Sequence, residues 1–142
     1  MLNEDALPLL EELIHSGAWW DLVDELGAHR VGAVLAKAPA RVKPVLRRWS
    51  RGRDLWLRRA AILAQLKHRD ATDVDLLFDV IAPAVDEKEL FHRKAIGWAL
   101  RELASWKPDA VERWLAAHEG RAAGLTVREA RRGLARARGV RR

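Results

Sequence analysis

Apolar residues recur at intervals of three and four along nearly the whole chain, which is the spacing of amphipathic helices. No run of alternating β-branched residues is bounded by turn residues, so we expect no β-sheet. The pattern predicts an all-α fold with helices over 5–15, 18–26, 29–38, 42–50, 53–67, 73–85, 87–105, 108–118 and 127–138.

Capping residues and glycines mark several expected helix ends. Thr72 and Asp86 each precede an acidic first turn, and Pro108 suits the first turn of another helix. Thr126 and Glu129 have the spacing of a capping box. Glycines stand where helices are expected to stop, at Gly17, Gly27, Gly52 and Gly120. Because the connections are short, neighbouring helices are expected to pack antiparallel as hairpins.

A faint internal repeat favours a stack of such hairpins. Six residues of one expected helix recur in the next long one: Leu55, Trp56, Arg58, Arg59, Ala60 and Ala64 match Leu90, Phe91, Arg93, Lys94, Ala95 and Ala99. A repeated helix pair predicts a helical solenoid. Chance similarity between two basic amphipathic helices is the alternative explanation.

Composition narrows the class of protein. With 142 residues, 49% of them apolar, the chain is expected to form one domain with a substantial core. The 26 Lys and Arg outnumber the 20 Asp and Glu, and the net charge of +6 predicts attraction to a polyanion such as nucleic acid. The lack of cysteine excludes disulfides, thiolate metal sites and zinc fingers. We expect no export signal, no membrane span and a cytoplasmic, nucleoid-associated protein.

Helical projection of the first aromatic segment, 19–24, places Trp20 and Asp24 together on one flank, beside the residues that should enter the core. A large ring and a carboxylate four residues apart suit a cation or a developing positive charge. The plainer interpretation is that Trp20 packs between hairpins and Asp24 is solvated.

In the second segment, 55–66, Arg59 projects into the middle of an apolar arc that includes Leu55 and Trp56. An arginine there requires an anionic partner, because a desolvated unpaired charge is costly. Asp24 and a phosphate are the candidate partners, and an Arg that reaches water or a structural carboxylate is the alternative. Arg58 points elsewhere and is expected to be solvated.

The third segment, 94–106, is apolar over most of its circumference, Trp106 included, and leaves Trp98 on a strip with Lys94, Arg101 and Ser105. A ring between two cations suits a groove that follows a sugar-phosphate backbone. A Trp that seals the next hairpin between ordinary surface cations explains the same strip.

These segments, with a fourth at 124–130, resemble in order and spacing the DNA alkylation repair glycosylases with HEAT-like repeats (AlkD-type). The matching patterns are W-W-D-x-V-D at 19–24, W-L-x-R-x-A-I at 56–62, K-A-I-G-W-x-L-R-E at 94–102 and G-L-T-x-R-E-A at 124–130. The match runs from about Ala18 to the end of the chain, which corresponds to the central and C-terminal repeats of that family.

The resemblance implies both a fold and an activity. The fold is a right-handed, armadillo-type solenoid of stacked antiparallel helix pairs with a basic concave groove, here one domain over 1–142. The activity is hydrolysis of the N-glycosidic bond of cationic N3- or N7-alkylated purines in duplex DNA, without base extrusion and without a metal, a cofactor or a covalent intermediate. Alkylated duplex DNA is the implied partner, and no membrane or obligate protein partner is expected.

Carried over residue by residue, the family's catalytic Asp falls on Asp24, its cleft-lining tryptophans on Trp20 and Trp98, and its active-site Arg on Arg59. Asp24 is expected to stabilise oxocarbenium character and orient water, the rings to pack against the sugar, and Arg59 to hold a flanking phosphate or orient Asp24. Further DNA contacts are expected from Lys94, Arg101, Arg58, Arg128, Arg131 and Arg132.

The chain departs from the family in length. The family's N-terminal repeats are expected to be absent here or reduced to the helix over 5–15, unless the true start codon lies upstream. A groove that lacks these repeats would close less completely around DNA. The arginine-rich stretch after 127 either adds phosphate contacts or forms a solvated helix and tail.

Two other classes of function fit the same sequence. One is a catalytically weak helical-repeat module that binds DNA, and the other is a protein-interaction scaffold. The five histidines are scattered without ligand spacing, and neither a phosphate-binding glycine loop nor a Ser/His/Asp set can be picked out, so other catalytic chemistries find no support.

Overall fold

The computed structural model describes residues 6–16, 24–85, 90–118, 120–122 and 124–139, and within these ranges the regular structure is helical throughout. The helices are α1 (Leu7–Ser16), α3 (Gly32–Lys37), α4 (Pro39–Arg51), α5 (Leu55–Leu63), α6 (Val74–Ile81), α7 (Leu90–Trp106), α8 (Pro108–Ala117) and α9 (Gly124–Ala137). Shorter segments are η2 (Leu26–Val31), η3 (Arg69–Ala71) and η4 (Ala82–Ala84). The all-α prediction is confirmed.

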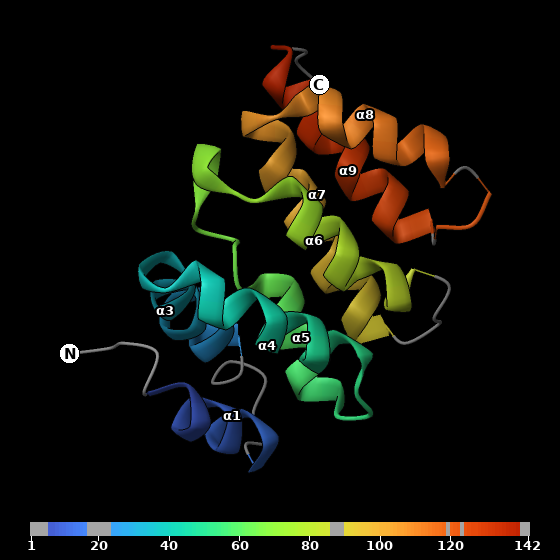
Figure 1. Ribbon diagram of the computed structural model, residues 1–142. Coiled ribbons are helices and arrows are strands. Elements are labelled where there is room, and N and C mark those ends of the chain that lie inside the picture. Colours follow the sequence, from blue (N-terminus) through green and yellow to red (C-terminus); the bar gives the residue numbers. More distant parts are fainter. Residues whose placement is uncertain (1–5, 17–23, 86–89, 119, 123, 140–142) are drawn as a thin grey trace.

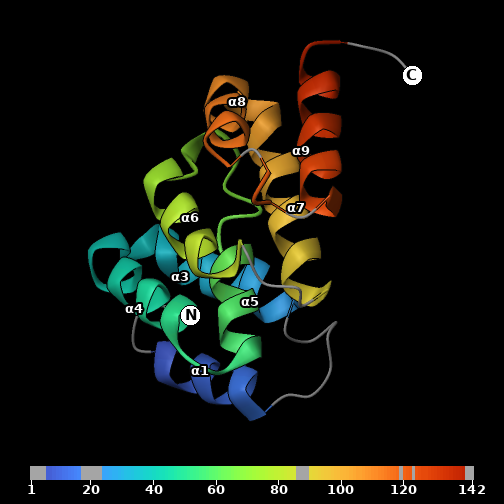
Figure 2. The same cartoon turned by 90° about the vertical axis from the view of Figure 1, so that its right-hand side faces the viewer.

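The helices stack in succession from α1 at one end of the molecule to α8 and α9 at the other (Figure 1). Turning the molecule shows α7 and α9 side by side, with α4 and α6 together on the opposite side (Figure 2). One core of buried apolar side chains runs through the stack from Leu7 to Leu134. This is the helix-pair arrangement that the faint repeat predicted.

Several helix ends follow from local chemistry. The Asp54 carboxylate accepts hydrogen bonds from the backbone N–H groups of Trp56 and Leu57, which starts α5. Asp73, rather than the predicted Thr72, caps α6 and accepts from the Leu76 N–H. Gly52 ends α4 as predicted, because the helix stops at an extended residue there.

Two predicted boundaries are wrong. Gly27 does not stop a helix: it lies inside a continuous helical stretch from 24 to 37, whose middle part, η2, is a π-helix. Thr126 does not cap α9, which begins at Gly124; its hydroxyl instead donates to the Arg93 carbonyl oxygen at 3.3 Å. In both cases packing against another helix determines the geometry, and a local signal could not reveal it. The predictions at Gly17 and Asp86 lie outside the described residues.

Two residues assigned to apolar arcs are more exposed than predicted. Leu55 is 44% exposed because it is the first residue of α5, and Trp106 is 45% exposed at the last residue of α7. Helical projection assumes that neighbours cover the whole length of a helix, and at helix ends that assumption fails. The exposed Trp106 ring therefore belongs to the surface rather than to the core.

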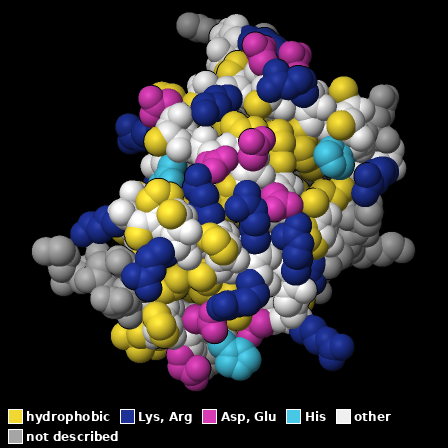
Figure 3. Space-filling view, in the orientation of Figure 1, with side chains coloured by type: hydrophobic (Ala, Val, Ile, Leu, Met, Phe, Trp, Pro, Cys, Tyr) yellow, Lys and Arg dark blue, Asp and Glu magenta, His cyan; other side chains and the backbone are white. Residues whose placement is uncertain are grey.

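The cations of α4 are largely neutralised by neighbouring carboxylates. On the face shown in Figure 3, Lys and Arg side chains gather over the middle of the molecule with Asp and Glu among them. Lys43 pairs with Asp73 at 2.5 Å, and Arg47 and Arg51 both pair with Asp79, at 2.6 and 2.7 Å. These ion pairs join α4 to α6, so this basic helix contributes to the structure more than to an open cationic surface.

Candidate active site

Three of the four predicted site residues come together on three different helices. Asp24 stands at the start of the described stretch that leads into η2, Arg59 is in the middle of α5, and Trp98 is in α7. Arg59 donates from Nε to Asp24 Oδ1 at 2.6 Å and from its terminal NH2 to Oδ2 at 2.9 Å. The fourth residue, Trp20, lies outside the described residues.

The pair joins a buried cation to a partly exposed carboxylate. The Arg59 side chain is 1% exposed and that of Asp24 is 28% exposed. A guanidinium without an anionic partner would be strongly unfavourable at that depth, and two parallel N–H···O bonds fix the plane of the carboxylate. The sequence prediction that Arg59 needs an anion, with Asp24 as one candidate, matches this geometry.

Trp98 completes the cluster through its contact with Arg59. The guanidinium carbon of Arg59 lies 5.3 Å from the centroid of the Trp98 ring, within the range of a cation–π contact. Trp98 is 39% exposed, and this exposed part is open to a ligand. One buried arginine thus holds both an acid and an aromatic ring at the surface.

A surface pocket of about 280 Å³ lies against Asp24 and Trp98. Its other walls are Glu25, Ala28, His29, Leu63, Leu66 and Lys67. The pocket therefore presents the oriented carboxylate of Asp24, a second carboxylate, one half-exposed indole, several apolar side chains and a lysine. Such a set suits a sugar ring or a flat, positively charged group better than a small anion.

Two glycines explain how the residues around Asp24 come so close to α5. A Cβ on Gly27 would stand 3.1 Å from the Ala60 Cα, and a Cβ on Gly32 would stand 2.5 Å from the Ala64 carbonyl oxygen. His68 strengthens the same contact, with Nε2 2.9 Å from the Gly32 carbonyl oxygen. Only residues without a side chain allow this approach, which places Asp24 within reach of Arg59.

The sequence prediction missed three polar residues of the pocket: Glu25, His29 and Lys67. It placed a helix break at Gly27, which separated His29 from Asp24, whereas the π-helical stretch keeps both on one pocket wall. His29 Nε2 lies 3.5 Å from a Glu25 carboxylate oxygen. Leu26 and Ala28, on both sides of Gly27, are buried, but apolar neighbours fit a helix stop as well as an unbroken helix, so no local signal could have found these three residues.

The predicted DNA-contacting cations are placed differently from one another. Lys94, Arg128 and Arg131 are exposed. Glu129 accepts from Arg101 at 3.3 Å and from Arg132 at 3.5 Å, so one carboxylate between α7 and α9 engages both cations.

Two of the expected arginine environments need correction. Arg58 is half-buried with its Nε shielded, not solvated as predicted. The Arg59 side chain is enclosed and its guanidinium is paired with Asp24. It is therefore not presented to a flanking phosphate.

His118 and His15 make structural contacts away from the pocket. His118 stacks on the Trp114 ring with centroids 4.2 Å apart, and its Nδ1 lies 2.8 Å from the Trp114 carbonyl oxygen. His15 pairs with Asp54, which raises the pKa of that imidazole above its ordinary value. Within the described ranges, no three His, Asp or Glu side chains gather as a metal site would require. No helix in those ranges combines the length and apolarity needed to cross a bilayer.

Known proteins resemble this chain in both sequence and fold. A solved structure of a "Predicted DNA alkylation repair enzyme from Enterococcus faecalis" is similar to this chain with a TM-score of 0.77 and 28% sequence identity. The similarity covers 89% of this chain and 58% of that one, so the chain spans little more than half the length of its structural relative. None of the curated proteins matches the chain. A family model for DNA alkylation repair enzymes matches residues 2–134, and the chain therefore belongs to the DNA alkylation repair enzyme family.

Proposed function

We propose that this protein is a monofunctional DNA glycosylase that hydrolyses the N-glycosidic bond of cationic N3- or N7-alkylated purines in duplex DNA. The observation that carries the proposal is the carboxylate of Asp24, held at the pocket surface by the buried Arg59 and flanked by the Trp98 ring. Membership of a DNA repair family supports DNA as the substrate. The pocket chemistry supports this type of reaction.

The chemistry begins with a substrate that is already charged. In an N7- or N3-alkylated purine nucleoside the base carries the positive charge, so the C1′–N bond breaks with both electrons going to the base. The base departs as a neutral molecule and needs no general acid. The positive charge moves to the deoxyribose as an oxocarbenium ion, and the site has to stabilise that charge.

Asp24 supplies the negative charge that this step requires. Its carboxylate faces the pocket and is partly exposed, so it can approach C1′ and the ring oxygen of a sugar seated there. Water then adds to C1′ and releases one proton to the solvent, which leaves an abasic site. Each carboxylate oxygen keeps a lone pair beyond its bond to Arg59, and that lone pair can accept the hydrogen bond that orients the attacking water.

Arg59 is a positioning residue in this proposal. Its two hydrogen bonds hold the carboxylate in place before substrate arrives, so little reorganisation accompanies the reaction. Trp98 presents a π-face beside it, and that face attracts a cationic base or a sugar carrying positive charge. Trp20, four residues before Asp24, is proposed as the second ring of this pocket.

The decisive experiment replaces Asp24 by Asn. A duplex containing N7-methylguanine is incubated with excess enzyme, and the released base is measured over time. We expect Asp24→Asn to lower the single-turnover rate at least about a hundredfold, the scale of losing one electrostatic contact to a developing charge. Affinity for the duplex should stay within a few-fold, because Asp24 makes no favourable contact with phosphate.

Asp75→Asn is the matched control, since Asp75 is an exposed carboxylate of α6 outside the pocket. It should excise at the wild-type rate. Both variants are first shown to be folded at the assay temperature by circular dichroism. Full activity of Asp24→Asn would refute the proposal, whereas a borohydride-trapped enzyme–DNA adduct in the wild type would show lyase chemistry in place of simple hydrolysis.

A further inference from the structure

A second hollow continues from the Asp24 pocket along α7. The two hollows share Leu66 and Lys67. The second has a volume of about 300 Å³, and its remaining walls are Arg69, Glu102, Ser105 and Trp106. The sequence placed Ser105 on the Trp98 strip but predicted no role for Arg69, Glu102 or Trp106 in the site, and the proposed reaction uses none of the four.

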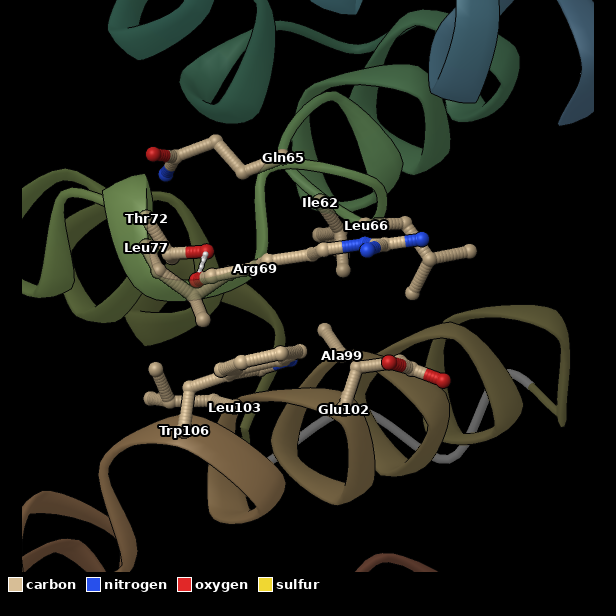
Figure 4. A pocket seen from close by; sticks show the side chains of 10 residues that line it. All are labelled: Ile62, Gln65, Leu66, Arg69, Thr72, Leu77, Ala99, Glu102, Leu103 and Trp106. Carbon is tan, nitrogen blue, oxygen red and sulfur yellow. Dashed lines mark hydrogen bonds between the residues drawn. The ribbon is translucent and has the colours of Figure 1, made fainter.

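Figure 4 shows the inner end of this hollow, where the Arg69 side chain extends across the space beside Leu66. Trp106 and Glu102 form the facing wall, which belongs to α7. The enclosed part has a volume of only about 10 Å³, room for one water at most. Room for a ligand is therefore left only in the outer part of the hollow.

The backbone of Arg69 is unusual. Its φ of 56° lies in the left-handed region, the one positive value among the described non-glycine residues. A non-glycine residue is held there against steric strain, and such strain concentrates at ligand-binding positions. The Thr72 hydroxyl donates to the Arg69 carbonyl oxygen at 2.8 Å and helps to fix the turn. The strained turn aims Arg69 along the hollow.

The cations of this hollow are not committed to internal ion pairs. In the part of the chain that the structure describes, Lys67 and Arg69 are exposed and make no side-chain hydrogen bond or ion pair, unlike Arg47, Arg51 and Arg101. Their two positive charges exceed the single negative charge of Glu102. The hollow thus carries net positive charge, a hydroxyl from Ser105 and a flat ring that is 45% exposed.

We propose that Lys67, Arg69, Ser105 and Trp106 form a subsite that binds one backbone phosphodiester of the DNA strand, a few nucleotide steps from the alkylated nucleotide in the Asp24 pocket. Arg69 and Lys67 contact the phosphate oxygens, Ser105 donates a hydrogen bond, and Trp106 packs against the adjoining deoxyribose. The inference rests on the proposed function, since it takes the Asp24 pocket as the place of the damaged nucleotide.

The distance between the Trp98 and Trp106 rings determines how far the bound phosphate lies from the damaged nucleotide. Trp98 and Trp106 are eight residues apart on α7, which is roughly 12 Å along the helix axis. For a duplex lying along α7 this equals roughly three or four nucleotide steps of one strand. The subsite would therefore hold the strand on one side of the lesion and fix which sugar reaches Asp24.

Replacing single phosphates by uncharged methylphosphonates tests the subsite directly. The probe is a duplex with one N7-methylguanosine that carries a 2′-fluorine, which slows loss of the base, and the methylphosphonate is moved one position at a time along each strand. Wild-type affinity should fall about tenfold at one position a few steps from the lesion, as expected for one charge-assisted hydrogen bond. Arg69→Gln should bind the all-phosphate duplex about tenfold more weakly and no longer respond to that position.

Lys67→Gln is the second variant, because Lys67 is exposed and its replacement avoids the strained turn. It should show the same loss of response. Arg113→Gln, an exposed arginine of α8 outside both hollows, is the matched control and should keep the wild-type pattern. Glu102→Gln should tighten binding, since it removes the one negative charge near the phosphate.

The outcomes separate the two proposals. If the wild type excises N7-methylguanine but Arg69→Gln and Lys67→Gln keep the wild-type response at every position, the subsite is refuted and the glycosylase stands. If the phosphate response depends on Arg69 but no base is released, the glycosylase alone is refuted. A wild-type protein that binds no duplex overturns both.

Discussion

The ion pair between Arg59 and Asp24 determines what single substitutions in the site can reveal. The guanidinium is buried, and the carboxylate is its partner through two hydrogen bonds. Removing one member leaves the other with an unsatisfied charge, whereas removing both leaves neutral groups that can pack. The pair therefore contributes to stability and to the proposed chemistry through the same two bonds.

A double-mutant cycle measures the stability contribution of this pair. Asp24→Asn should lower the free energy of unfolding by about 2–3 kcal/mol, below the range for fully buried pairs because Asp24 is partly exposed. Adding Arg59→Met, which fills similar volume without charge, should recover part of that loss. Urea denaturation of the wild type, both single variants and the double variant gives the four values. Strictly additive losses would show that the two residues are not coupled in stability.

Residue-level prediction succeeded where a charged side chain stood among apolar positions of a helix. An arginine in an apolar arc required an anion, and Asp24 was one of the two candidate partners; the structure shows the pair. Residue-level prediction failed where the ion-pair partner lies on another helix, because local sequence does not show which helices pack together. Glu129 bridging Arg101 and Arg132 is such a case, because an exposed strip on α7 gives no sign that α9 covers part of it.

At the scale of elements, the contact between α5 and the stretch from 24 to 37 positions the site. Gly27 and Gly32 lie against the α5 backbone and its extension, at Ala60 and Ala64. The π-helical turns of η2 lie between them, and π-helical turns are frequent at functional sites. The sequence prediction read Gly27 as a helix stop because glycine serves both purposes, and only the packing partner distinguishes a stop from a close approach.

Gly32→Ala should disturb this contact. The added Cβ would lie 2.5 Å from the Ala64 carbonyl oxygen, so the two segments must separate. The expected loss is about 1–3 kcal/mol in the free energy of unfolding even after the gain in helix propensity, together with slower base excision, because Asp24 moves relative to Arg59. Thermal or urea denaturation and the excision assay measure the two effects.

Gly124→Ala provides the comparison. Its nearest contact would be the flexible end of the Arg128 side chain at 3.3 Å, and stability should change by less than about 1 kcal/mol. Equal effects of the two substitutions would indicate that helix propensity rather than close packing determines the result.

At the scale of the whole molecule, one core joins all the described helices from α1 to α9, and ion pairs reinforce the outer helices. The helical periodicity predicted this class of fold because amphipathic spacing is present along almost the entire chain. The helical periodicity alone could not predict the order in which the helices pack. Only the faint repeat and the family resemblance indicated that order. The second hollow depends on that packing, since its walls come from the turn after α5 and from the end of α7.

Stability should fall in acid as the α4–α6 ion pairs are lost. Hydrogen bonds from Arg51 and Arg47 hold the pKa of Asp79 below its ordinary value, and Lys43 does the same for the pKa of Asp73. The stabilisation is complete above the unfolded-state pKa, about 4 for an aspartate, and disappears as the pH falls through the lower folded-state pKa. Urea midpoints of the wild type should therefore decrease steeply below about pH 4.

Asp79→Asn isolates the contribution of one carboxylate. The variant should be less stable than the wild type near pH 6, and the difference should shrink between about pH 4 and pH 2 as the wild-type carboxylate takes up its proton. A difference that stays constant across this range would show that Asp79 contributes through packing and not through its charge.

The burial of Arg59 has one further consequence. The counter-charge of Asp24 comes from inside the protein and is 1% exposed, so mobile ions of the surrounding medium cannot replace it. Attraction of DNA to exposed lysines and arginines is, in contrast, screened over a Debye length of about 10 Å at 0.1 M ionic strength. In the proposed enzyme, rising ionic strength would weaken capture of the duplex while leaving the electrostatics at the scissile bond almost unchanged.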